Sequence, residues 1–167
     1  MSQMFGLAVM RLADAQLLPF RYSHYARKIS EYLDSAAGWT RDQDGNEIAK
    51  LDLGSAKALA REIAARAEAL EHRAEADLEA GRGTEEARAA LNDQLAHLEQ
   101  TLLDESASPA ERWYRHVIYG WNIYSLYEGQ PLPGLAEAIR LRDPTRIAKE
   151  TARIESALRR MLDGLGH

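Results

Sequence analysis

Residues 55–102, SAKALAREIAARAEALEHRAEADLEAGRGTEEARAALNDQLAHLEQTL, decide the fold class of this chain. They divide at Gly81-Arg82-Gly83 into two segments rich in Ala, Leu, Glu and Arg, which have high helix propensity. Apolar residues recur in both at spacings of three and four, which predicts one helix over about 56–80, capped by Ser55, and a second capped by Thr84. Because the linker is short, we expect the two helices to be antiparallel neighbours.

The same periodicity predicts helices along most of the chain. In the helix predicted over about 56–80, the residues expected to face the core are Leu59, Ile63, Ala67, Leu70, Ala74 and Leu78. In the helix capped by Thr84, they are Ala87, Leu91, Leu95, Leu98 and Leu102. Further helices are predicted over 3–17, 22–37, about 134–141 and about 145–163, the last opened by Asp143-Pro144.

The connecting segments contain turn residues. Gly38 is expected to end the helix that precedes it, and Asp44-Gly45 marks a turn in a polar loop over 40–53. Residues 120–133 are expected to be irregular because Gly and Pro recur there. The sequence therefore predicts an all-α fold, four-helix-bundle-like with extra short helices and one long irregular loop. We expect a single helical domain over residues 1–167.

The segment expected to form the first helix is apolar on almost every face. Its apolar residues are Met4, Phe5, Leu7, Ala8, Val9, Met10, Leu12, Ala13 and Ala15. A helix that is apolar all round is normally buried on all sides. In so small a domain, we therefore expect something beyond this chain to cover it, and Pro19 to break the helix.

Composition excludes several classes of function. The net charge of -5 argues against binding to nucleic acid or anionic membranes, and the absence of cysteine excludes disulfides, thiolate zinc sites and a cysteine nucleophile. No apolar run approaches the ~20 residues of a membrane span, and we read no targeting signal in the chain. The sequence therefore does not determine the cellular compartment.

No catalytic or metal-binding motif is apparent. The five histidines are His24, His72, His97, His116 and His167, and none belongs to a paired His or His-Glu-x-x-His motif. A Gly-x-Ser-x-Gly elbow is absent as well. We therefore predict no catalytic residues, no metal ligands, no cofactor and no enzymatic activity for this chain alone.

Two polar or aromatic clusters leave alternatives open. Asn92-Asp93-Gln94 lies within a predicted helix, where it forms either a solvated face or a polar network with a neighbouring loop. The aromatic residues 113–127 either close the end of the bundle or form an interaction surface. Closing the bundle is favoured for Trp113, Tyr114 and Tyr119, whereas Tyr127, which precedes Gly129-Gln130-Pro131, is expected at the surface.

Several short segments occur in an order that matches a known family. They are Leu18-Pro19-Phe20, Tyr25-Ala26, Asn92-Asp93-Gln94-Leu95 with Leu98-Glu99, Tyr114-Arg115-His116-Val117-Ile118-Tyr119, Leu126-Tyr127-Glu128-Gly129 and Leu132-Pro133-Gly134. Together they resemble the C-terminal helical dimerisation domain of the glutamate carboxypeptidase II and transferrin receptor family of zinc peptidases. The resemblance covers nearly the whole chain.

The resemblance implies a function for this chain. It implies a homodimerisation domain that also packs on a peptidase domain absent here, with two zinc ions in that missing domain. A Lys-Tyr pair that binds the substrate carboxylate in the carboxypeptidase members falls on Leu126 and Tyr127. The parent would be a zinc-dependent carboxypeptidase or aminopeptidase, with doubtful glutamate preference because Leu126 replaces the cation. The alternative is a free-standing helical protein–protein interaction module.

Overall fold

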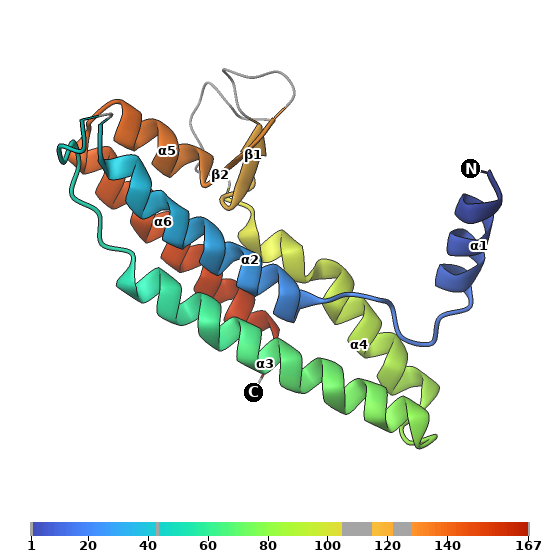
Figure 1. Cartoon of the computed structure of the whole chain (residues 1–167). Helices are drawn as coiled ribbons and strands as arrows, with labels where there is room; N and C mark the ends of the chain where they lie inside the picture. Colours follow the sequence, from blue (N-terminus) through green and yellow to red (C-terminus); the bar gives the residue numbers. More distant parts are fainter. Residues whose placement is uncertain (1, 43, 105–114, 122–127, 167) are drawn as a thin grey trace.

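The computed structural model describes residues 2–42, 44–104, 115–121 and 128–166. Most of them are helical. Four helices form an elongated bundle (Figure 1): α2 (Tyr22–Ser35), α3 (Gly54–Glu79), α4 (Glu85–Leu98) and α6 (Pro144–Gly164). The short helix α5 (Pro133–Arg140) lies at one end of it. The predicted all-α fold class is confirmed.

Helices α2 (Tyr22–Ser35) and α3 (Gly54–Glu79) form the centre of the bundle and run in opposite directions (Figure 1). The residues of α2 that are completely buried are Ala26, Ile29 and Leu33, one stripe of the helix. Those of α3 are Ala56, Ala60 and Ile63. The alanines let the helices approach closely, because the distance between helix axes depends on the side chains at the contact.

Helix α6 (Pro144–Gly164) packs against α3, α5 (Pro133–Arg140) and the 3-10 helix η2 (Glu99–Leu102). Its start agrees with the prediction, since the Asp143 carboxylate accepts a hydrogen bond from the backbone N–H of Arg146 at 3.0 Å. Its buried apolar residues are Ile147, Ile154, Ala157, Leu158, Met161 and Leu162.

Helix α4 (Glu85–Leu98) also begins as predicted, with Thr84 Oγ1 accepting from the N–H of Ala87 at 3.2 Å. It diverges from α3 beyond their shared turn, and its C-terminal end meets η2 and α6 (Figure 1). The principal neighbours of α3 are instead α2 and α6. The expected core stripe of α3 was therefore partly wrong: Leu59, Leu70, Ala74 and Leu78 are only half-buried.

Three predicted helix boundaries need correction. Helix α1 covers Ser2–Ala13 and ends before the expected residue 17. Beyond α2 the chain passes through Gly38 in the 3-10 helix η1 (Ala36–Thr40), so this glycine does not end the helical segment. Helix α3 begins one residue before Ser55, and the Asp52 carboxylate accepts from the N–H of Gly54 at 2.9 Å, so Ser55 is not the cap.

A short hairpin corrects the expectation that residues 120–133 are irregular. Strand β1 (Tyr119–Trp121) pairs antiparallel with β2 (Gly129–Pro131), with Tyr119 opposite Pro131. A Cβ atom at position 129 would collide with the hydroxyl of Tyr119, which explains the glycine there. Pro131 is tolerated because each strand of a two-stranded sheet has a free edge.

Candidate functional site

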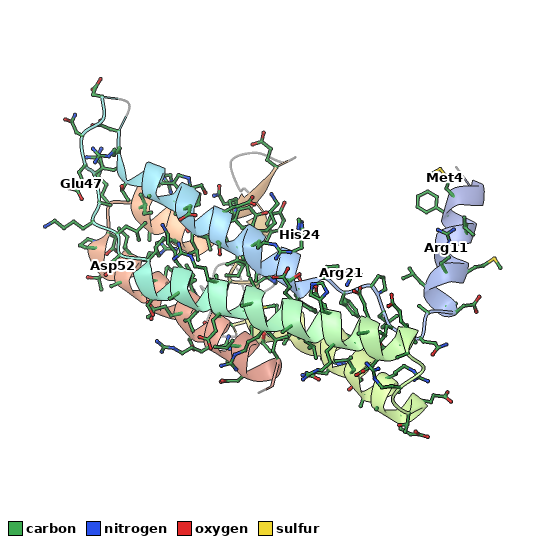
Figure 2. The ribbon with its side chains drawn as sticks, turned by 60° about the horizontal axis from the view of Figure 1, so that its bottom comes forward. Met4, Arg11, Arg21, His24, Glu47 and Asp52 are labelled. Carbon is green, nitrogen blue, oxygen red and sulfur yellow. The ribbon has the colours of Figure 1, made fainter. Side chains whose placement is uncertain are left out.

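Helix α1 presents apolar side chains that no other described part of the chain covers. It stands away from the bundle at the end of an extended segment (Figures 1 and 2). Met4 is 78% exposed and Phe5 is 69% exposed, and the other large apolar side chains with high exposure on this helix are Leu7, Val9, Met10 and Leu12. This supports the prediction that something else covers the helix, because large exposed apolar patches mark interaction sites.

A polar clamp holds the segment that connects α1 to the bundle. The side chain of Asn92, on α4, accepts a hydrogen bond from the N–H of Leu18 at 2.9 Å and donates one to the carbonyl of Gln16 at 3.0 Å. Further along the same helix, Gln94 Nε2 donates to the carbonyl of Gly164 at 2.7 Å. Of the two interpretations left open for Asn92-Asp93-Gln94, the structure therefore supports the polar network with a neighbouring segment for Asn92, while Asp93 and Gln94 are exposed.

An apolar groove of about 230 Å³ lies beside this clamp. It is bordered by the connecting segment on one side and by α3 and α4 on the others. The apolar residues that line it are Leu17, Leu18, Pro19, Phe20, Leu70, Ala74, Leu78, Leu91 and Leu95. The half-buried residues Leu70, Leu78 and Leu91 therefore face the connecting segment across this groove.

Three polar side chains meet where α2, η2 and the segment before β1 come together. The hydroxyl of Tyr25 donates to Glu99 Oε1 at 3.3 Å and lies 3.4 Å from His116 Nε2. His116 Nε2 is also 3.6 Å from Glu99 Oε1. Burial raises the pKa of the Tyr25 hydroxyl, and the Glu99 carboxylate raises it further. Tyr25 therefore acts here as a neutral hydrogen-bonding group.

A second group of polar contacts, here called the α2–α3 seam, joins these two helices through Ser23 and Glu71. The Glu71 carboxylate accepts from the N–H of Ser23 at 2.9 Å and from its hydroxyl at 2.7 Å, so a residue of α3 satisfies the first turn of α2. Arg21 pairs with Glu75 at 2.5 Å beside it. Sequence reasoning missed Glu71, because its partner is distant along the chain.

Among the residues that the structure describes, two histidines lie close together. His24 and His72 line one open pocket on the α2–α3 seam, together with acidic and basic residues of both helices. The residues that the structure describes contain no group of three or more His, Asp or Glu side chains placed to hold a metal ion.

Several residues singled out in the sequence lie outside the described residues. They are Trp113, Tyr114, Tyr124, Leu126 and Tyr127, and the last two are the predicted substrate-binding pair. The hairpin strands β1 and β2 lie immediately on either side of residues 122–127. Tyr119, expected to close the bundle, is 47% exposed. None of the described helices is long and apolar enough to cross a bilayer.

Comparison with known proteins identifies the family. The model of the transferrin receptor-like dimerisation domain matches residues 50–166. The probable glutamate carboxypeptidase LAMP1 of Arabidopsis thaliana is 31% identical over 139 residues, which cover 83% of this chain and 19% of that protein. The probable glutamate carboxypeptidase AMP1 of the same plant is 25% identical over 161 residues, 96% of this chain and 23% of that protein. The aminopeptidase NAALADL1 of Rattus norvegicus is 30% identical over 135 residues, 80% and 17% respectively.

A helical bundle that presents an uncovered apolar helix is typical of a domain that packs against other protein surfaces. The chain belongs to the transferrin receptor-like dimerisation domain family. The predicted family is therefore confirmed. The chain spans about a fifth of the length of the curated relatives LAMP1, AMP1 and NAALADL1.

Proposed function

We propose that this chain is the self-associating helical domain of a larger protein of the zinc-peptidase type, and that it forms a homodimer without catalytic activity of its own. The observation that carries this proposal is the family match over residues 50–166, which includes α3, α4, α5 and α6. A twofold-symmetric pair would use the same surface of the bundle on both subunits.

Helix α1 has a different role in this proposal, because it packs against the peptidase domain of the parent protein. It lies outside the matched range of the dimerisation domain. The similarity to AMP1 nevertheless covers 96% of the chain, so at least part of α1 is shared with a much longer protein. A helix that is absent from the dimerisation model, shared with a longer relative and uncovered in the bundle fits a contact with another domain.

The contribution to catalysis is indirect in this proposal. Two zinc ions and the groups that act with them would belong to the peptidase domain, and no step is assigned to a metal in this chain. Residues Leu126 and Tyr127 would lie near the substrate pocket of the parent enzyme, as the family resemblance implies. The names of LAMP1, AMP1 and NAALADL1, two carboxypeptidases and an aminopeptidase, support the peptidase type but not one substrate.

Sedimentation equilibrium of the chain and of a charged α1 variant tests this proposal. The double substitution Leu7→Glu and Val9→Lys makes α1 polar without changing the net charge. Ala65→Glu, on an exposed face of α3, is a control for a new surface charge. We expect dimers for the wild type, for the control and for the α1 variant, with circular dichroism showing equal helix content.

Two results would contradict the proposal in different ways. A wild type that stays monomeric at high micromolar concentration would refute self-association. An α1 variant that becomes monomeric would show that only α1 associates, which favours the alternative of a free-standing helical interaction module. A continuous upstream reading frame encoding a peptidase domain would argue against that alternative.

A further inference from the structure

His116 lies at the base of the β1–β2 hairpin, where three chain segments meet. The N–H of Val117 donates to the carbonyl of Leu102 at 3.0 Å, which joins this segment to η2. The N–H of Leu132 donates to the carbonyl of Ile118 at 2.8 Å, which joins it to the residue after β2. The imidazole is half-buried between these contacts and α2.

The hydrogen bonds of the ring determine which nitrogen carries the proton. His116 Nδ1 lies 3.2 Å from the backbone nitrogen of Ile118 and 3.1 Å from that of Tyr119. Both partners are N–H donors, so Nδ1 must be an acceptor without a proton. The neutral ring therefore carries its proton on Nε2, which faces Tyr25 and Glu99 on the bundle.

We propose that His116 is a proton-sensitive latch for the hairpin. In its neutral form, the ring connects the first residue of β1 to the bundle, with Nδ1 on the hairpin side and Nε2 on the bundle side. A proton taken from solvent onto Nδ1 removes the acceptor of two hydrogen bonds and places N–H opposite N–H. The start of β1 then loses its connection to the bundle through this ring.

The charged and titratable groups around the ring set the pH at which this happens. Glu99 of η2 faces Nε2 and favours the charged ring, whereas Tyr25 of α2 is neutral. Lys28 of α2 lines the same shallow pocket as Tyr25 and Glu99. On the chain segments beside the ring, Arg115 is exposed, and Asp104 is held in an ion pair.

The balance of these effects favours the closed latch at neutral pH. Burial lowers the pKa of His116, and this effect exceeds the opposing effect of the Glu99 carboxylate. The ring is therefore neutral at pH 7, because its pKa lies below the ordinary value for histidine. This property goes beyond the proposed role in association, and it concerns the isolated chain whether or not a parent enzyme exists.

Nuclear magnetic resonance of the isolated chain tests the latch directly. Imidazole ¹⁵N shifts report the tautomer of His116, and hydrogen exchange reports the protection of the Ile118 and Tyr119 amides. We expect the Nε2–H tautomer at pH 7.5. On acidification, protonation of Nδ1 should coincide with loss of protection at these two amides, about tenfold per pH unit as the pH falls toward the pKa of His116 and levelling off below it, after correction for intrinsic exchange. The core amide of Ile154 should keep its protection.

Two substitutions separate the two sides of the ring. In His116→Asn, the side-chain oxygen can replace Nδ1 as acceptor, so the two amides should stay protected at every pH. In His116→Gln, the amide reaches the position of Nε2 but leaves Nδ1 unreplaced, so they should be unprotected even at pH 7.5. His97→Asn is the matched control, because His97 is exposed on α4, and it should leave the transition unchanged.

The proposal fails if the neutral ring carries its proton on Nδ1. It also fails if the ring titrates while the two amides keep their protection, or if His116→Asn exchanges with the pH dependence of the wild type. None of these results depends on dimerisation or on peptidase activity, so the latch and the proposed function are tested separately.

Discussion

The side chain of Asn92 holds the backbone of Leu18, with a hydrogen bond of 2.9 Å between residues that are 74 positions apart in the sequence. The same amide donates to the carbonyl of Gln16, so both of its polar atoms are used. A single residue in the middle of α4 therefore fixes the path of the chain between the bundle and α1. This amide therefore helps to set the direction in which the chain leaves the bundle toward α1, and hence where α1 is presented to another protein surface.

Replacing Asn92 by alanine should loosen the segment that leads to α1. The substitution removes both hydrogen bonds and leaves a partly buried N–H without its acceptor, which costs about 1–3 kcal/mol. We expect faster proteolysis within residues 14–18 and a lower free energy of unfolding in urea. Asp93→Ala is the control, because Asp93 is exposed on the next position of the same helix. Equal proteolysis rates for the two variants would show that the clamp does not restrain the segment.

Replacing Arg153 by methionine should destabilise the bundle strongly. Arg153 Nε donates to Asp104 at 2.9 Å and Nη1 donates to both oxygens of the buried Glu150 at 2.9 Å. Removing one partner of a buried ion pair leaves an uncompensated charge and costs about 3–5 kcal/mol. Arg159→Met, which removes the exposed guanidinium that pairs with Glu155 at 3.5 Å, is the control and should cost less than about 1 kcal/mol. Urea denaturation of both variants measures the difference.

The stability of the chain should fall on acidification, in part through His116. The pKa of His116 is lowered in the folded protein, so the unfolded chain binds the proton at a higher pH than the folded chain does. This contribution is fully present above the unfolded pKa of about 6.5 and is lost as the pH falls toward the folded value. Urea denaturation at pH 7.5, 6.5 and 5.5 should show a larger loss for the wild type than for His116→Asn. Parallel losses in the two proteins would contradict this assignment.

In a full-length parent enzyme, Tyr127→Phe should weaken substrate use with little effect on folding. The resemblance places the Tyr127 hydroxyl on a substrate carboxylate, and a hydrogen bond to a charged group contributes about 1.5–3 kcal/mol. We therefore expect kcat/KM to fall roughly ten- to a hundredfold. Leu126→Lys should act in the opposite sense and raise the preference for peptides that end in Glu or Asp. Steady-state kinetics on acidic and apolar substrates tests both changes, and an unchanged substrate ratio would remove Leu126 and Tyr127 from the pocket.

Local sequence signals predicted much of the fold. Thr84 was correctly predicted as a helix cap and Asp143-Pro144 as the start of the last helix, and each of the two side chains bonds a backbone N–H only three residues away. The helix predicted over 22–37 also formed, and its completely buried residues Ala26, Ile29 and Leu33 lie on one face, as helical periodicity requires. The family resemblance also depended only on the sequence, as an ordered series of short segments.

Local signals were insufficient where distant segments compete for the same surface. Sequence pattern favoured Leu59 over Ala56 and Ala60 as a core residue of α3, but the close approach of α2 buries the alanines and leaves Leu59 half-exposed. The hairpin was missed because glycine and proline usually interrupt strands. At Gly129 the Tyr119 side chain lies so close that a Cβ atom would collide with it unless the tyrosine moved.

The sequence by itself therefore determined the helical class, the starts of α4 and α6, the apolar character of α1 and the family. The tertiary structure alone decided how the polar residues are used. Asn92 could have faced solvent, but the connecting segment of α1 passes within hydrogen-bonding distance of it. The tautomer of His116 depends on two backbone amides and on Tyr25, 91 positions away. Hydrogen bonds are short and directional, so their partners are defined only after the chain has brought distant segments together.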